Sequence, residues 1–275
     1  MEKTLFLDAG NTRIKAAEKV RGSEVRTEST QSASDPAADS RTWKLHRLPE
    51  YDAPEFESGL RDLCRSFDRI VLSSVKKKFQ ADELERLLGT QTGHQSRRIR
   101  AITRSVLTAD RHRYLTPETL GIDRYLACLG AWSLGTGPVI VTDAGTACTI
   151  DGMDAGGVYR GGVIMPGLHM LIKVLGSGAD GLFPVSSTLP DSWPPDSTAT
   201  ALQAGTAGTF LAAWEAHVRR WQTLFPDARI WLTGGDASFL LKNSTIKAEY
   251  DGYLVFEGMR HWLEHDLEQT SQGRS

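Results

Sequence analysis

The amino-acid sequence predicts an α/β protein built from two similar halves. An apolar run that ends in Asp, a small residue and Gly, followed by a second strand-like run, occurs at residues 5–15 and again at 138–151. Segments with helical spacing of apolar residues also alternate with strand-like runs, which is typical of helices packed on mixed sheets. Because the pattern occurs once in each part of the 275-residue chain, we expect residues 1–120 and 121–275 to be related halves.

Composition and charge narrow the possible classes of function. The chain has 32 basic and 34 acidic side chains, so it lacks the basic excess of a nucleic-acid-binding protein. Cys64, Cys128 and Cys148 have no paired spacing, which favours reduced thiols over disulfides or a zinc site. No apolar run approaches the length of a membrane span, and the N-terminus leads directly into a strand. We therefore expect a cytoplasmic protein that binds neither nucleic acid nor membrane.

The first of the two repeated stretches reads Leu-Phe-Leu-Asp-Ala-Gly-Asn-Thr-Arg-Ile-Lys. A buried strand would end at Asp8, and Gly10, Asn11 and Thr12 would form a tight turn that presents N–H groups, hydroxyls and one carboxylate. Such a group of donors suits a phosphate, and the carboxylate suits magnesium. Taken alone, the stretch is equally compatible with an ordinary β-hairpin. The second stretch, around Asp143, favours the phosphate interpretation, because two facing turns can hold a nucleotide from both sides.

The remaining elements of the first half alternate regularly. Residues 55–67 have apolar side chains at helical spacing, residues 69–75 form a strand-like run, and residues 79–88 predict a second helix. Between the strand and that helix, three lysines at 76–78 favour a solvated turn over a phosphate contact. The polar segment 22–54 has no clear periodicity or alignment.

The second half begins with a helix predicted over residues 122–134. Asp123 and Arg124 lie in its first turn, where free N–H groups and the helix dipole stabilise a carboxylate. From composition alone, a capping Asp123 and a surface Arg124 are the preferred interpretation. The later predicted elements are a turn at Gly156 and Gly157, a helix that follows a glycine-rich run at 161–167, a long helix over 198–224, a strand from 229 that ends at Gly234, and a last helix over 251–267.

In this order, these segments resemble the type III pantothenate kinases, a branch of the actin-like ATPase (ribonuclease H-like) fold that includes the Bvg accessory factor proteins. The resemblance covers most of the chain and depends on an ordered set of motifs. These motifs are residues 8–15, Gly121-Ile122-Asp123-Arg124, residues 143–147, residues 161–167, Thr198 seven residues before Gly205, residues 233–235 and residues 256–259. The resemblance implies two mixed-sheet halves with a cleft between them.

The resemblance also implies the activity, which is ATP-dependent phosphorylation of pantothenate to 4′-phosphopantothenate, the first step towards coenzyme A. Asp123 would accept the proton of the pantothenate hydroxyl. The implied ATP- and phosphate-binding residues are Asp8, Gly10, Asn11, Thr12, Lys15 and Thr146. The implied substrate-binding residues are Tyr114, Gly121, Ile122, Arg124 and Thr198. Asp8 would also hold Mg²⁺, Asp143 would bind a monovalent cation, K⁺ or NH₄⁺, and a homodimer is implied.

Two departures from the family pattern keep other functions open. Arg13-Ile14 stands where many relatives have Asn-Thr or Ser, and lysines follow Val75 where relatives often have Val-Pro. One alternative is an actin-fold kinase for another small alcohol, such as a sugar. The other is a regulatory or binding protein without catalysis, although Asp8, Lys15, Asp123 and Asp143 are all present, which favours an enzyme.

Overall fold

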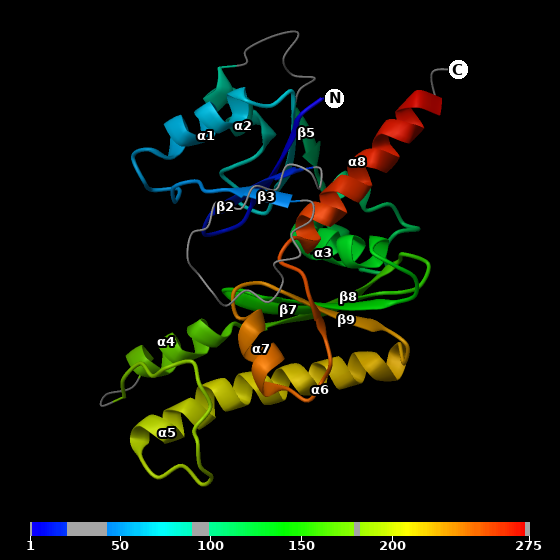
Figure 1. The fold of residues 1–275 in the computed structure, drawn as a ribbon. Coiled ribbons are helices and arrows are strands. Elements are labelled where there is room, and N and C mark those ends of the chain that lie inside the picture. Colours follow the sequence, from blue (N-terminus) through cyan, green and yellow to red (C-terminus); the bar gives the residue numbers. More distant parts are fainter. Residues whose placement is uncertain (1, 21–42, 90–98, 179–181, 273–275) are drawn as a thin grey trace. The chain divides into compact units, whose positions relative to one another are not determined.

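The computed structural model describes residues 2–20, 43–89, 99–178 and 182–272 (Figure 1). Of the polar segment at 22–54, residues 22–42 lie outside the described residues. The chain divides into two compact units. The first comprises Met1–Ala109, Leu115–Gly130 and Val255–Ser275, and the second comprises Asp110–Tyr114 and Ala131–Leu254. These units are discontinuous in sequence, so the halves at 1–120 and 121–275 stay a prediction.

The first unit is built on a five-stranded mixed sheet with β1 at its centre. The strand order is β3-β2-β1-β4-β5. β1 pairs antiparallel with β2 and parallel with β4. The strands are β1 (Thr4–Ala9), β2 (Ile14–Lys19), β3 (Trp43–His46), β4 (Arg69–Ser74) and β5 (Ile99–Ile102).

Alternate residues of β1 face two different layers of the first unit, as the pleat of a strand requires. Leu5 and Leu7 belong to a core that includes buried residues of α1 (Phe56–Arg65) and α2 (Ala81–Leu88). Phe6 lies on the other face, where its ring contacts the Trp43 ring with centroids 5.3 Å apart. Asp8, two residues after Phe6, therefore shares a face with Phe6 and points away from the α1–α2 core.

The last helix, α8 (Leu254–Gln272), is attached to β3 by a buried carboxylate. Trp43 Nε1 donates a hydrogen bond of 2.6 Å to Glu257, which also pairs with Arg260 at 2.8 Å and is 5% exposed. Burial alone would raise the pKa of Glu257, but the hydrogen bonds from Arg260 and Trp43, with the charge of Lys19, lower it. α8 also touches the backbone of α3 (Ile122–Ser133), since a Cβ at Gly258 would lie 2.0 Å from the Leu126 carbonyl oxygen.

The second unit contains a second five-stranded sheet with the order β10-β9-β6-β7-β8. β6 is central, pairs antiparallel with β7 and parallel with β9, and so occupies the place that β1 has in the first sheet. This equivalence confirms the predicted duplicated α/β fold of actin-like type. The cleft predicted between the halves stays a prediction. The strands are β6 (Val139–Ala144), β7 (Ala147–Met153), β8 (Tyr159–Pro166), β9 (Arg229–Thr233) and β10 (Glu249–Tyr250).

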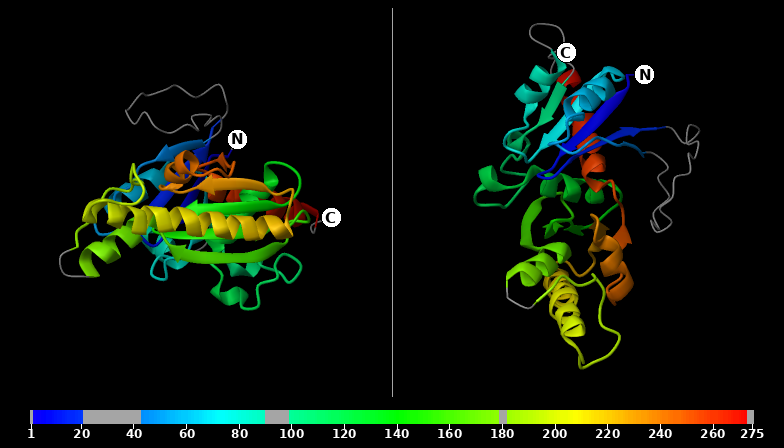
Figure 2. Two further views of the ribbon diagram at one scale, coloured as in Figure 1. Left: turned by 90° about the horizontal axis from the view of Figure 1, so that it is seen from below. Right: turned by 90° about the vertical axis from the view of Figure 1, so that its left-hand side faces the viewer.

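Helices α6 (Thr209–Leu224) and α7 (Ala237–Asn243) pack on one face of the second sheet (Figure 2). Trp214 of α6 is fully buried and donates a hydrogen bond of 2.8 Å to Thr142 in β6. The predicted long helix over 198–224 is present but interrupted, because a π-helical turn at Ala204–Gly208 separates α5 (Thr198–Gln203) from α6. α4 (Leu168–Gly178) follows β8 directly, as the glycine-rich run predicts.

The close contact at Gly258 yields a stability prediction. Gly258→Ala is expected to lower the stability of the protein by about 1–3 kcal/mol, because its methyl group would push α8 away from the α3 backbone. Gly205→Ala is the control, because no atom lies within 4 Å of the added Cβ. The midpoint of thermal unfolding measures both, and equal midpoints in the two variants would contradict this packing.

Candidate functional site

The first candidate region is the four-residue turn that joins β1 to β2. Gly10 N donates a hydrogen bond of 3.1 Å to the Arg13 carbonyl and closes the turn, while Asn11 and Thr12 are exposed. The hairpin register places Asp8 directly opposite Lys15. The turn therefore lies next to one carboxylate and one ammonium group, and its predicted role in phosphate binding stays a prediction.

An additional hydroxyl lies next to Asp8 on the other neighbouring strand. The parallel register of β1 and β4 pairs Asp8 with Ser73. The Ser73 side chain is fully buried, and its Oγ has no hydrogen-bond partner among the described residues. Asp8 itself is 8% exposed. Carboxylate and hydroxyl oxygens are ligands that Mg²⁺ accepts, so these residues fit a divalent cation bound with a nucleotide.

Two side chains from elsewhere in the first unit contact the same turn. Tyr51 Oη donates a hydrogen bond of 2.9 Å to the Gly10 carbonyl, and Lys76 Nζ donates one of 3.0 Å to the Asn11 carbonyl. The Lys76 ammonium also lies 3.7 Å from the centroid of the Tyr51 ring. Lys77 and Lys78 are exposed, as a solvated turn predicts, whereas Lys76 is half-buried and bonded to the first turn. Tyr51 carries no motif that would have identified it from the sequence.

The start of α3 supplies the other charged residues of the first unit. Asp123 accepts a hydrogen bond of 2.9 Å from the Arg124 N–H, so its carboxylate folds back over the helix N-terminus. A Cβ at Gly121 would lie 2.6 Å from Asp123 Oδ1, which explains why the preceding residue is glycine. Ile122 is buried and anchors the helix start, and Arg124 is 8% exposed. Asp8, Lys15, Asp123 and Arg124 thus belong to one compact unit.

The second candidate region is the corresponding turn at the end of β6, which is two residues shorter, because only Gly145 and Thr146 separate β6 from β7. Gly145 N donates a hydrogen bond of 3.2 Å to the Ala147 carbonyl, and Thr146 is exposed. Thr149 lies opposite Asp143, where the first hairpin has Lys15 opposite Asp8. The two turns therefore share their position in the sheet but differ in charge.

Glycine backbones surround the second turn. A Cβ at Gly167 would lie 2.1 Å from the Gly145 carbonyl oxygen, and one at Gly234 would lie 2.5 Å from Asp143 Oδ1. Gly234 also has a φ of +90°, which favours glycine. These glycines therefore let the backbone segments at this edge pack closely against the turn, and the nucleotide predicted at the glycine after the strand from 229 stays a prediction.

Two further polar residues at this edge were absent from the predicted site. Asp236 N donates a hydrogen bond of 2.9 Å to the Ala144 carbonyl, and the Asp236 carboxylate pairs with His169 Nδ1 at 3.0 Å. His169 follows the glycine-rich run at 161–167, and Asp236 follows Gly234 and Gly235, so the position just after a glycine-rich segment is the signal in the sequence that points to both.

Burial, together with nearby acidic side chains, keeps the Cys148 thiol near the second turn protonated. Burial raises the pKa of Cys148 to about 12, with further contributions from Asp143, Asp236 and Asp151. Among the described residues, no cluster of three or more His, Cys, Asp or Glu side chains could hold a metal ion. A cation at Asp143 would therefore need other oxygen ligands, such as backbone carbonyls.

The predicted substrate-binding residues of the second unit lie on other elements. Tyr114 lies beside β8, with its ring centroid 6.2 Å from that of Tyr159. Thr198 is exposed at the first residue of α5 and follows the N-cap Ser197. These residues of the second unit therefore lie at three separate places. Asp143 and Thr146 lie at the second turn, Tyr114 lies beside β8, and Thr198 lies at the start of α5. Their predicted roles stay predictions.

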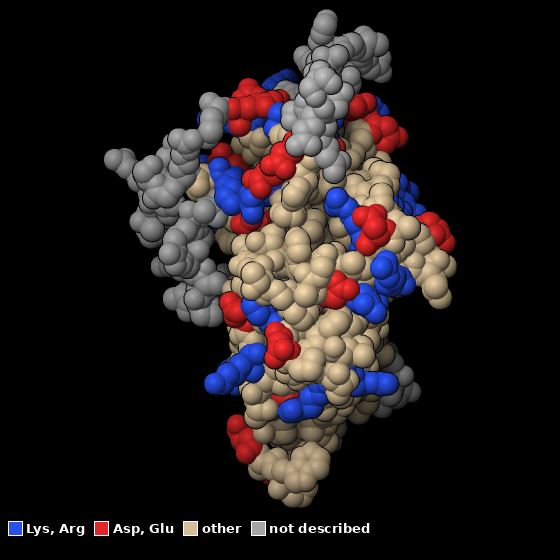
Figure 3. All heavy atoms as spheres, turned by 90° about the vertical axis from the view of Figure 1, so that its right-hand side faces the viewer, with Lys and Arg blue, Asp and Glu red and all other residues tan. Residues whose placement is uncertain are grey.

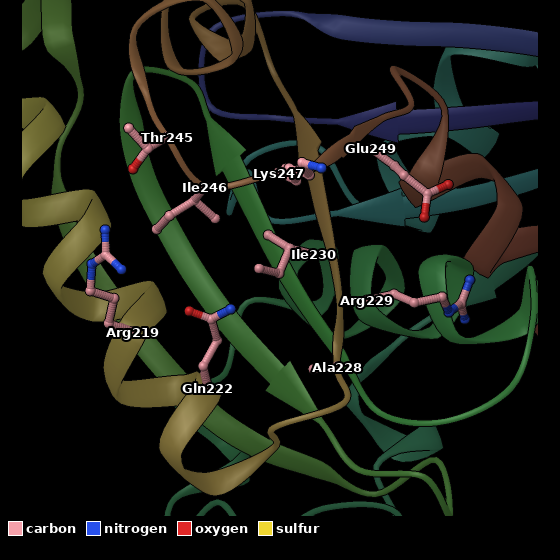
Figure 4. Close-up of a pocket in the computed structure, with 10 residues that line it drawn as sticks. Arg219, Gln222, Ala228, Arg229, Ile230, Thr245, Ile246, Lys247 and Glu249 are labelled. Carbon is pink, nitrogen blue, oxygen red and sulfur yellow. The ribbon is translucent and has the colours of Figure 1, made fainter.

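A pocket of about 510 Å³ in the second unit lies at the opposite edge of the second sheet (Figure 4). Arg229 and Glu249, at the first residues of β9 and β10, contribute to its lining, whereas Asp143 and Gly234 lie at the other ends of β6 and β9. The pocket is therefore separate from the second turn.

On the face drawn in Figure 3, basic and acidic side chains are interspersed. In the part of the chain that the structure describes, no helix is long and apolar enough to cross a bilayer.

Comparison with known proteins identifies one family. The family model described as type III pantothenate kinase matches residues 4–220. A type III pantothenate kinase from Laribacter hongkongensis is 30% identical over 263 residues, which cover 94% of this chain and 97% of that one. One from Phocaeicola vulgatus is 37% identical over 155 residues, which cover 56% of this chain and 64% of that one.

A solved structure shows the same fold. The crystal structure of a Baf family transcriptional activator from Campylobacter jejuni superposes with a TM-score of 0.59 and covers 96% of this chain and 99% of that chain. The sequences are 20% identical, so this similarity bears on the fold alone.

The glycines at the second turn provide a matched pair of variants. Gly234→Ala is expected to lower the stability by about 1–2 kcal/mol from the left-handed backbone alone, and further because its methyl group would meet Asp143. Gly235→Ala is the control, because no atom lies within 4 Å of its added Cβ. Thermal unfolding compares the two variants, and a Gly234→Ala midpoint at the level of the control would contradict the described geometry.

Proposed function

Because the chain belongs to the type III pantothenate kinase family, we propose that it transfers the γ-phosphoryl group of ATP to the primary hydroxyl of pantothenate. The products are ADP and 4′-phosphopantothenate, and the reaction is the first step towards coenzyme A. One observation carries the proposal. A single compact unit contains both the Asp8–Lys15 pair beside an open turn and the Asp123 carboxylate at the start of α3.

The first turn is proposed to bind the phosphates of ATP. The exposed Asn11 and Thr12 can donate hydrogen bonds, and the Lys15 ammonium can neutralise charge as the γ-phosphoryl group departs. Asp8 would hold Mg²⁺ together with ATP, and the neighbouring Ser73 hydroxyl fits this role as a further oxygen. When bound, Mg²⁺ neutralises negative charge on the phosphates.

Asp123 is proposed as the general base. Its carboxylate is only partly buried and accepts a hydrogen bond from the Arg124 N–H at the helix N-terminus, where the helix dipole favours negative charge. An ionised carboxylate can accept the proton of the pantothenate hydroxyl and orient that oxygen for attack. Arg124, the next residue, supplies a cation for the carboxylate of pantothenate.

The residues of the second unit have proposed roles in binding. Thr146 would contact ATP, Asp143 would bind K⁺ or NH₄⁺, and Tyr114 and Thr198 would form hydrogen bonds with pantothenate. These roles are supported by the motifs around each residue and by the exposed position of Thr146 at its turn. We also propose that the enzyme acts as a homodimer in the cytoplasm.

The choice of acceptor and of cation tests the proposed reaction. With ATP and Mg²⁺, the purified protein is expected to release ADP when pantothenate is present and to release little with glucose, glycerol or N-acetylglucosamine. Turnover is expected in potassium and to be much lower in sodium alone, as measured by a coupled ADP-release assay. Turnover with a sugar in preference to pantothenate would support the alternative of another actin-fold kinase. Equal turnover in both salts would remove the cation site from the proposal.

A single substitution tests the general base. Asp123→Asn is expected to lower kcat by about 10²–10⁴-fold, because the amide cannot accept the proton while its shape is preserved. Glu118→Gln is the control, since Glu118 is an exposed carboxylate in the 3₁₀ turn at Pro117–Thr119 just before α3. Initial rates and thermal unfolding are measured for both variants. A folded Asp123→Asn protein with near-normal kcat would exclude Asp123 as the base.

A further inference from the structure

Two consecutive carbonyl groups of the first turn are held by side chains from distant parts of the chain. The Gly10 carbonyl accepts from Tyr51 Oη at 2.9 Å, and the Asn11 carbonyl accepts from Lys76 Nζ at 3.0 Å. These donors are 41 and 65 residues away in the sequence. They contact each other as well, because the Lys76 ammonium lies 3.7 Å from the centroid of the Tyr51 ring.

The planarity of the peptide bond links these carbonyls to the N–H groups of the turn. In a trans peptide the C=O of one residue and the N–H of the next point in opposite directions. Fixing the Gly10 carbonyl therefore fixes the Asn11 N–H, and fixing the Asn11 carbonyl fixes the Thr12 N–H. Among the described residues, neither of these N–H groups has a hydrogen-bond acceptor, whereas Gly10 N is bonded to Arg13.

Both side chains are themselves held firmly. The Tyr51 ring packs against the rings of Phe56 and Phe79, with centroid distances of 5.2 and 6.0 Å. The Lys76 backbone is fixed on both sides, since its N–H donates to Ser74 Oγ at 3.2 Å and its carbonyl accepts from Gln80 Nε2 at 2.8 Å. The turn is therefore supported by groups that belong to the same unit and its core.

The Tyr51 hydroxyl stays protonated, as a hydrogen-bond donor to the Gly10 carbonyl must. Burial raises the pKa of the Tyr51 phenol, and the negative charge of Asp8 raises it further. The hydroxyl therefore keeps its proton at neutral pH and can donate to the Gly10 carbonyl.

We propose that Tyr51 and Lys76 are positioning residues for the phosphates of the nucleotide. By holding the Gly10 and Asn11 carbonyls on one side of the turn, they direct the Asn11 and Thr12 N–H groups to the other side, where both can donate to phosphate oxygens. This inference rests on the proposed function, since it requires a nucleotide at the first turn. It assigns Lys76 to the support of the turn and not to direct contact with phosphate.

Equilibrium titration of the full-length protein with a fluorescent ATP analogue and Mg²⁺ tests the inference without requiring turnover. Tyr51→Phe keeps the ring and removes the donor, and Lys76→Met keeps the chain length and removes the ammonium. Each variant is expected to raise the Kd for the nucleotide by about 3- to 10-fold, the effect of one lost hydrogen bond. Lys77→Met, at an exposed neighbouring lysine, is the matched control and is expected to bind like the wild type.

Steady-state kinetics separate positioning from a general loss of structure. Tyr51→Phe and Lys76→Met are both expected to raise the KM for ATP. The KM for pantothenate and the midpoint of thermal unfolding are expected to stay close to those of the wild type. Lys76→Arg is expected to restore most of the affinity, because a guanidinium can also donate to the Asn11 carbonyl and stack on Tyr51.

The outcomes distinguish this inference from the proposed function. Weakened binding in Lys76→Met with wild-type binding in Tyr51→Phe would overturn the inference and indicate a direct contact between Lys76 and phosphate. Wild-type binding in both variants would also overturn it while leaving the kinase proposal intact. A wild-type protein that does not bind the ATP analogue would overturn the proposed function, and this inference with it.

Discussion

The register of the β1–β2 hairpin is the constraint on which the first candidate region depends. It places Asp8 opposite Lys15, on the sheet face away from the core that contains Leu7 and Ile14. A slip of one residue would turn both charged side chains into that core and move its apolar side chains to the other face of the sheet. The burial of Leu5, Leu7, Ile14 and Ala16 therefore determines where the charges lie. The same apolar packing that stabilises the first sheet also positions its polar edge.

The two sheets show how one architecture can support two different binding edges. Both have a central strand that pairs antiparallel with the next strand and parallel with a later one, and both end that central strand in Asp-Ala-Gly. The first turn has an ammonium group opposite its carboxylate, and it is braced by side chains. The second has Thr149 in that place and is surrounded by the backbones of Gly167 and Gly234. The first edge therefore supplies charge, whereas the glycines at the second edge allow its own backbone segments to pack closely.

The support of each turn limits what substitutions it can tolerate. In the first unit, the Tyr51 hydroxyl and the Lys76 ammonium group hold the carbonyls of the turn. The shape of this turn therefore depends on side chains, and these can be substituted with little change in the fold. In the second unit, Gly234 and Gly167 approach other backbone atoms so closely that any side chain would disturb them. The helix start at Asp123 has a similar requirement, because Gly121 leaves room for the carboxylate. Small residues thus matter here through the space that they leave to neighbouring groups.

Local sequence patterns predicted most of the strands, the two Asp-Ala-Gly turns and the helix that carries Asp123, and the ordered motifs predicted the family. These features depend on local periodicity and on residue types at fixed spacing, which are visible without a fold. The local patterns missed β3, β5 and β10, which are edge strands of two to four residues, too short to show a periodic pattern. Only the tertiary structure decided that Tyr51, Ser73 and Lys76 lie at the first turn and that His169 pairs with Asp236 at the second. Those contacts join residues far apart in the chain, and they exist only because the pairing of β1 with β4 and the packing of the helices bring their segments together.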